Sequence, residues 1–117
     1  MNRAYEKIRD TIIPVLLDKG FTKLEEKHHP GDFGGCYMIF RDAKELIRLT
    51  WDGKEQWFVL ESTPTTSVTV EAEWIDILLQ FYNPGKDGSE VVDEIAEDLK
   101  IALLDYLADV SRGAESA

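Results

Sequence analysis

The chain has 117 residues, the size of a single domain and long enough to bury a hydrophobic core. A composition of 44% hydrophobic and 31% charged residues is typical of a globular protein and excludes a disordered or fibrous chain. With 23 acidic and 13 basic residues the net charge is −10, so we expect no nucleic-acid partner unless a local basic patch exists. The single cysteine, Cys36, excludes an internal disulfide and a zinc site made of cysteines alone.

The sequence leads us to expect no signal peptide and no membrane-spanning segment. The N-terminus, Met-Asn-Arg-Ala-Tyr-Glu-Lys, lacks the apolar stretch of a signal peptide. No apolar run approaches the ~20 residues needed to cross a bilayer. We therefore expect a cytoplasmic protein with no membrane partner, made of one α+β domain over residues 1–112 and a disordered tail over residues 113–117.

The negative charge belongs to the C-terminal half of the chain. Residues 1–60 hold ten basic and ten acidic residues, whereas residues 61–117 hold three basic and 13 acidic residues. Such an asymmetry has two interpretations: a surface that keeps the protein soluble, or a surface that binds a basic partner.

The first 35 residues predict a helix, a short strand and a loop. Apolar residues at three- and four-residue spacing predict an amphipathic helix over residues 3–19, and Gly20 supplies its C-terminal stop. A strand over residues 21–27 would point Phe21 and Leu24 inward. The next residues are rich in glycine and proline, which is typical of a loop.

Three antiparallel strands follow, over residues 36–41, 45–51 and 56–62. Asp52-Gly53 predicts a hairpin between the last two, with a positive φ at the glycine. Alternation assigns one set of residues to the core face of the sheet: Cys36, Met38, Phe40, Ile47, Leu49, Trp51, Phe58 and Leu60. The opposite face carries Tyr37, Ile39, Arg41, Leu46, Arg48, Thr50, Trp57 and Val59.

Two C-terminal helices complete the predicted α+β fold, with a sheet of three or four strands in a meander. Residues 62–70 form a linker or a further strand. Helical spacing predicts one helix over residues 71–82 and a longer one over residues 87–110. The inner stripe of the longer helix contains Val92, Ile95, Leu99 and Leu103.

One cluster contains residue types that are typical of catalytic and metal sites: His28, His29, Asp32 and Cys36. A cysteine and a histidine form a nucleophile–base pair in some enzymes, and two histidines with an aspartate can hold a metal. However, Cys36 begins an apolar strand, where cysteine behaves as a small buried residue, and no further ligand has a fixed spacing. We therefore predict no catalytic residue, no metal, no cofactor and no enzymatic activity.

The face opposite the core is a candidate ligand site. Tyr37, Arg48 and Trp57 would form an aromatic platform edged by a guanidinium group. Such a platform is suited to stacking a base or an aromatic ligand, or to holding a hydrophobic side chain of a partner. The alternative is that a helix covers this face.

The last helix is a candidate partner-binding surface. It carries like charges at i,i+4, and each such pair costs about 0.2–0.5 kcal/mol in an isolated helix. This surplus of acid favours a basic protein partner for the helix. The predicted contact residues are Glu90, Asp93, Glu94, Glu97 and Asp98.

The segment Trp-Asp-Gly-Lys-Glu-Gln-Trp (51–57) on a hairpin, a helix ending Leu-Asp-Lys-Gly-Phe (17–21) and an acidic C-terminal helix resemble two bacterial groups. One is the small acidic α+β immunity proteins that block secreted toxins. The other is the type III secretion chaperones, which are also small and acidic. The resemblance of this chain to them implies a homodimer. The chaperone pattern has strands after its second helix, whereas residues after Tyr82 are predicted to be helical, which favours the immunity proteins. Both resemblances imply a protein partner, and neither transfers a site residue.

Overall fold

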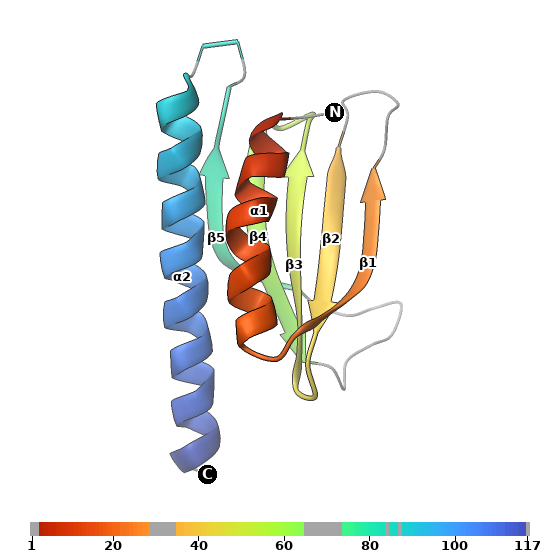
Figure 1. Cartoon of the computed structure of the whole chain (residues 1–117), viewed down its shortest axis with the longest axis vertical. Coiled ribbons are helices and arrows are strands. Elements are labelled where there is room, and N and C mark those ends of the chain that lie inside the picture. Colours follow the sequence, from red (N-terminus) through yellow and green to blue (C-terminus); the bar gives the residue numbers. More distant parts are fainter. Residues whose placement is uncertain (1–2, 29–34, 65–73, 84, 87, 117) are drawn as a thin grey trace.

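The structure is a computed structural model that describes residues 3–28, 35–64, 74–83, 85–86 and 88–116, with side chains as far as residue 109. It is an antiparallel sheet of five strands with one helix before it and one after it, about 47 × 30 × 20 Å in extent (Figure 1). The strands form a meander in the order β1-β2-β3-β4-β5. The elements are α1 (Arg3–Asp18), β1 (Thr22–His28), β2 (Cys36–Arg41), β3 (Glu45–Asp52), β4 (Trp57–Pro64), β5 (Ile75–Phe81) and α2 (Ser89–Ser116). The predicted α+β class is confirmed, but the sheet has five strands and only one helix follows it.

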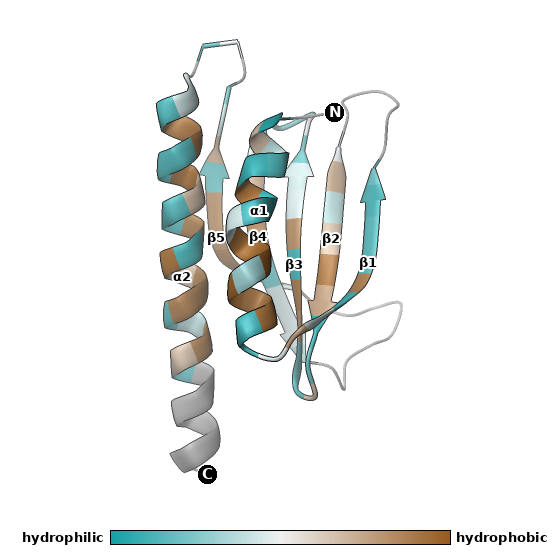
Figure 2. Cartoon of the chain, in the orientation of Figure 1, coloured by the Kyte–Doolittle hydropathy of each residue, from teal (hydrophilic) through white to brown (hydrophobic). Residues whose placement is uncertain are grey.

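Both helices pack on one face of the sheet and run in the same direction (Figure 1). The apolar stripes of the helices lie against the alternating apolar residues of β2, β3 and β4. Figure 2 shows hydrophobic and hydrophilic residues alternating along both helices. The face assignment made from alternation is confirmed for all eight predicted core positions, each of which is at least nine-tenths buried. The predicted inner stripe of the long helix, Val92, Ile95, Leu99 and Leu103, is buried as well.

Helix α1 ends at the predicted glycine. Gly20 has a φ of +89°, the N–H of Gly20 donates to the carbonyl of Leu17, and the N–H of Phe21 donates to that of Leu16. This is a Schellman motif, in which a residue without a Cβ adopts the left-handed conformation at low cost. The strand that follows has a bulge between its second and third pairings, and Leu24 in this bulge is 50% exposed. The prediction that Leu24 points inward is therefore wrong, while Phe21 is buried.

The β3–β4 hairpin lies where the sequence places it, but its turn is of another type. Four residues connect the strands, and the carboxylate of Asp52 accepts hydrogen bonds from the N–H groups of Lys54 and Glu55, both at 3.0 Å. Among the described residues, Gly20 is the one glycine with a positive φ, so the positive φ predicted for Gly53 is wrong. The left-handed residue of this turn is Gln56, with a φ of 58°.

The segment predicted as a helix over residues 71–82 is a strand where the structure describes it. Strand β5 pairs with β4, so that Leu78 lies opposite Leu60 on the core face and Leu79 lies opposite Val59 on the other face. A strand with apolar residues on both faces has a nearly continuous apolar run, which also fits helical spacing. The pairing decides the conformation, because β4 would otherwise leave its backbone groups without partners. Residues 71–73 lie outside the described residues.

Helix α2 crosses the whole domain, and Tyr106 ties it to the sheet by two hydrogen bonds. The hydroxyl of Tyr106 donates to the carboxylate of Glu45 on β3 and accepts from the hydroxyl of Ser62 on β4. The helix extends through Ser116 and so includes most of the segment 113–117, for which the sequence predicts a disordered tail. Neither helix, over its described residues, is long and apolar enough to span a membrane.

Candidate binding site on the second sheet face

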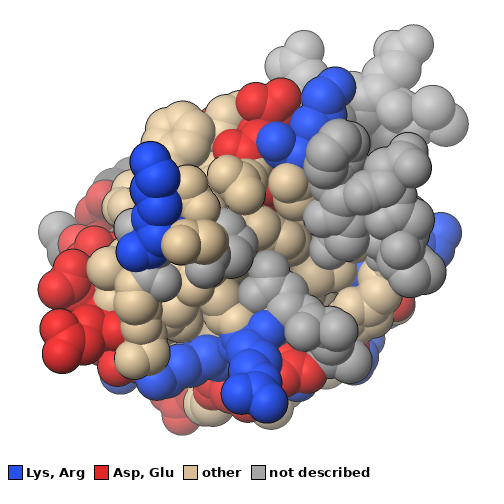
Figure 3. Space-filling model, turned by 90° about the horizontal axis from the view of Figure 1, so that it is seen from above, with Lys and Arg blue, Asp and Glu red and all other residues tan. Residues whose placement is uncertain are grey.

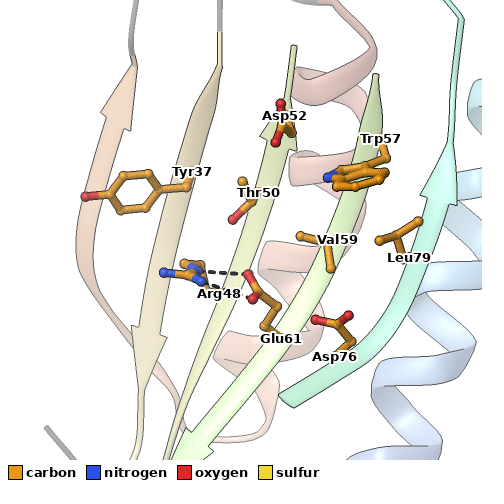
Figure 4. Close-up of a pocket in the computed structure, with 9 residues that line it drawn as sticks. All are labelled: Tyr37, Arg48, Thr50, Asp52, Trp57, Val59, Glu61, Asp76 and Leu79. Atoms are coloured by element: carbon orange, nitrogen blue, oxygen red, sulfur yellow. Dashed lines mark hydrogen bonds and ion pairs between the residues drawn. The ribbon is translucent and has the colours of Figure 1, made fainter. Parts of the chain in front are cut away.

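The second face of the sheet is the one opposite the core, and no described helix lies over it (Figures 1 and 4). The prediction left open whether a helix covers this face. Because α1 and α2 both pack on the core face, neither of these two described helices covers the second face.

Strand register arranges the side chains of the second face in three rows that run across the sheet. Residues paired across antiparallel strands point to the same side, and every second residue along a strand joins the same face. Each row is listed here from the β2 side of the sheet toward β5. The first row is Asp52, Trp57 and Phe81, the second is Tyr37, Thr50, Val59 and Leu79, and the third is Ile39, Arg48, Glu61 and Asp76.

These rows surround a hollow of about 390 Å³, which we call the sheet-face hollow. Figure 4 shows its lining residues, which are Tyr37, Arg48, Thr50, Asp52, Trp57, Val59, Glu61, Asp76 and Leu79. The three predicted ligand residues, Tyr37, Arg48 and Trp57, thus lie around one hollow. The volume is within the range of small-molecule pockets and is large enough for one long side chain.

The guanidinium of Arg48 is engaged on two sides. Its Nε and one terminal nitrogen donate to the two carboxylate oxygens of Glu61 at 2.9 and 3.0 Å, a bidentate pair drawn with dashed lines in Figure 4. It also lies 4.1 Å from the centre of the Trp74 ring, within cation–π range. A bidentate carboxylate takes two of the five N–H donors of an arginine and neutralises its charge, so Arg48 attracts an anionic ligand less than an unpaired arginine would.

Two further carboxylates flank the hollow. Asp52 lies opposite Trp57 in the register, and Asp76 lies opposite Glu61. Within the described part of the chain, neither Asp52 nor Asp76 forms an ion pair. With Arg48 neutralised by Glu61, the two aspartates leave the lining with a net charge of about −2 at neutral pH.

The aromatic wall of the hollow is half-exposed. The ring of Trp57 packs edge-on against Phe81, with centroids 5.4 Å apart, and Phe81 itself is 67% exposed. On the floor, the Oγ1 atom of Thr50 is buried and has no hydrogen-bond partner among the described residues. A buried hydroxyl without a partner is unusual in a folded protein.

The five predicted partner residues lie together on the outward side of α2. Glu90, Asp93, Glu94, Glu97 and Asp98 are all exposed. Of these five, Asp93 forms an ion pair with Lys7 of α1, and the other four form none with the described residues. Figure 3 shows acidic side chains gathered at its left edge, the side on which α2 lies in Figure 1.

The cysteine–histidine cluster is partly described. His28 lies opposite Cys36 across β1 and β2, and no group of three metal-ligating side chains occurs within the described ranges. Burial, followed by the charge of Glu26, raises the pKa of the Cys36 thiol to about 11. A raised pKa lowers the fraction of the reactive thiolate at neutral pH. His29 and Asp32 lie outside the described residues.

Sequence reasoning missed Glu61, Trp74 and Asp76. The partner of Arg48 follows from the hairpin register, but only once the turn is known to contain four residues rather than the two of an Asp-Gly turn. Trp74 and Asp76 fell within the segment predicted as a helix, where they would not face Arg48. Alternation along β4, from Trp57 to Glu61, was the signal that could have placed the glutamate on this face.

Comparison of the chain with protein-family models, with curated proteins and with solved structures finds no match. Inference about its function therefore depends on the charges and the geometry of the described residues.

Proposed function

We propose that this protein is a non-catalytic module that binds a basic protein partner through the outward face of α2. The observation that carries the proposal is the uncompensated charge of this face. Four of its five carboxylates, Glu90, Glu94, Glu97 and Asp98, are exposed and form no ion pair with a described residue.

The physical argument concerns the cost of this arrangement. Glu90 with Glu94, and Glu94 with Asp98, are like charges four residues apart, and each pair destabilises a helix by about 0.2–0.5 kcal/mol. A mixture of charges would keep the helix soluble without this cost. A basic partner would relieve the repulsion on binding and would be steered toward the face during association.

Both bacterial groups that the sequence resembles would use such a module. The preference for the immunity proteins depended on the prediction that the residues after Tyr82 are helical, and α2 (Ser89–Ser116) lies there, but no family match supports either group. The proposal therefore covers an immunity-like and a chaperone-like role alike. A toxin or effector reading frame beside the gene would decide between them.

The test neutralises the acidic face of α2. We expect the variant to be more stable than wild type by about 0.6–1.5 kcal/mol, since three like-charge pairs, Glu90–Glu94, Glu94–Asp98 and Asp93–Glu97, are relieved. We also expect it to capture fewer partners from the native host, and its remaining capture to depend less on salt. The substitutions are Glu90→Gln, Glu94→Gln, Glu97→Gln and Asp98→Asn.

A matched control removes the same number of negative charges, four, from residues outside α2 and should leave partner capture unchanged. The control substitutions are Asp10→Asn, Asp18→Asn, Glu25→Gln and Glu55→Gln. If the α2 variant and the control recover the same partners equally well, or if wild type recovers none, α2 is only a solvated surface and the proposal is wrong.

A further inference from the structure

We propose that the sheet-face hollow is a binding site for the cationic side chain of a lysine or arginine from a basic partner protein. The identity of the partner rests on the proposed function, but the preference for a cation follows from the hollow itself. Nothing in the sequence analysis assigned this chemistry, because the platform of Tyr37, Arg48 and Trp57 was expected to favour aromatic or apolar ligands.

The first argument is the charge of the lining. Arg48 is the one basic residue among the described lining residues. Glu61 binds its Nε and one terminal nitrogen and neutralises its charge, and Trp74 lies over one of its faces. A phosphate or a carboxylate would therefore meet two aspartates and a guanidinium that is already neutralised. An ammonium or guanidinium group would be attracted by the carboxylates of Asp52 and Asp76, which lie at opposite ends of the hollow and form no ion pair with any described residue.

The second argument is the shape and polarity of the hollow. Its middle row offers Val59 and Leu79 as an apolar floor, and Trp57 forms a wall beside Asp52 (Figure 4). Lysine and arginine have an apolar stem and a charged end, so one side chain can use both parts. The face of an indole attracts a cation, most of all where water is partly excluded.

The third argument is that the site is already organised. The Arg48–Glu61 pair holds two side chains of the lining in one geometry, and Glu61 is only 9% exposed. A site whose side chains are held before binding loses less conformational entropy when the ligand arrives.

The experiment uses the full chain, labelled with ¹⁵N, and follows the indole N–H signal of Trp57, assigned by its loss in Trp57→Phe. The probes are the Nα-acetyl amides of lysine and arginine, with the acetyl amide of norleucine as a neutral match for lysine. We expect the two cations to shift the Trp57 signal saturably and to bind at least about five-fold more tightly than norleucine. Equal binding of norleucine, or equal shifts caused by phosphate, would overturn the proposal.

Two variants test the carboxylates. Asp52→Asn with Asp76→Asn should weaken the binding of the lysine probe by at least about five-fold. Asparagine keeps the acceptor that Asp52 provides to the N–H groups of Lys54 and Glu55, and Asp76→Asn alone serves if the double variant unfolds. An unchanged affinity in a folded variant would show that the carboxylates do not bind the cation.

A matched control separates this inference from the proposed function. Glu94→Gln with Glu97→Gln removes the same charge from α2 and should leave the binding of the lysine probe unchanged. Loss of partner capture in the α2 variant, with normal probe binding, would support the proposed function and leave the hollow as a separate site. Normal capture in the α2 variant, with probe binding lost only in the aspartate variant, would overturn the proposed function and not this inference.

A peptide distinguishes the two sources of a cation. Acetyl-Gly-Gly-Lys-Gly-Gly-amide should bind at least as tightly as the lysine amide if the hollow takes a side chain from a protein. Binding of the free amino-acid amide alone would instead identify a small organic cation as the ligand and would overturn the assignment to a partner protein.

Discussion

Gln56 is the residue of the β3–β4 turn with a strained backbone conformation. Its φ of 58° is a conformation that residues with a Cβ adopt at a cost, and its N–H donates to the carbonyl of Asp52 at 2.7 Å. We expect Gln56→Gly to raise the free energy of unfolding by about 0.5–1 kcal/mol, because glycine relieves the strain by more than it adds flexibility to the unfolded chain. Urea denaturation measures this difference.

The control for this prediction is Gln56→Ala, which removes the same side chain but keeps the Cβ and the strain. A glycine variant no more stable than the alanine variant would show that the strain is compensated by other contacts of the turn.

The thiol of Cys36 makes the free energy of unfolding depend on pH in the alkaline range. Burial raises the pKa of its thiol from 9.0 to about 11, so the folded state holds the proton more tightly than the unfolded state. Stability is therefore lost as the pH rises from about 9 to about 11. We expect Cys36→Ala to remove part of this loss, to cost little stability at neutral pH and to leave partner binding intact.

The measurement is a series of denaturation curves from pH 7 to pH 10.5. A residual decline should remain in Cys36→Ala, since burial also raises the pKa of Tyr5 and of Tyr106. Identical pH profiles for the two proteins, or rapid labelling of native Cys36 by a thiol reagent, would contradict this prediction.

At the scale of elements, Tyr106 is the polar contact that ties α2 to the sheet. Its hydroxyl donates to Glu45 and accepts from Ser62, whose Oγ lies 2.9 Å away. Burial raises the pKa of Glu45, and the hydrogen bond from Tyr106 partly offsets this increase. We expect Tyr106→Phe to cost about 1–3 kcal/mol at pH 7, because a half-buried carboxylate and a buried hydroxyl lose their partner.

The cost should be smaller at pH 4 than at pH 7. Without the hydrogen bond the pKa of Glu45 rises further, so the folded variant gains stability as the pH falls and the carboxyl is protonated. Denaturation at both pH values gives the difference, and Glu45→Gln in a double-mutant cycle isolates the pair. An equal cost at both pH values would show that Tyr106 acts through packing alone.

Strand β5 shows how an element depends on its neighbour. Its apolar residues fit helical spacing, and a helix over them would give this chain the three helices that the sequence predicts. The register with β4 instead places Leu78 in the core and Leu79 on the second face. This one change adds a strand to the sheet and brings Asp76 beside Glu61.

At the scale of the whole molecule, the two helices lie on one side of the sheet, so the two candidate surfaces lie on opposite sides of it. The outward face of α2 carries exposed carboxylates, and the sheet-face hollow on the other side has two aspartates with no described ion pair. We propose that both surfaces bind cationic groups, and the net charge of −10 agrees with this. Because they lie on opposite sides of the sheet, variants of one can be compared with variants of the other.

Features that depend on residues a few positions apart could be predicted from the amino-acid sequence. The faces of β2, β3 and β4 follow from alternation, the inner stripe of α2 follows from helical spacing, and Gly20 ends α1 because the left-handed residue after a helix favours glycine. The acidic outward face of α2 is likewise a property of one helix and its own residues. These patterns are local, so no knowledge of the rest of the chain is needed to recognise them.

Only the tertiary structure decided the features that depend on distant residues. Arg48 and Glu61 are 13 positions apart, and their pairing requires the length of the turn between them, where the left-handed residue is Gln56 rather than Gly53. The strand β5 exists because β4 offers it backbone partners, and the second face has no described helix over it because both helices bury their apolar stripes on the core side. Register and layer placement are set by the packing of whole elements, and the spacing of residues within one element carries no information about them.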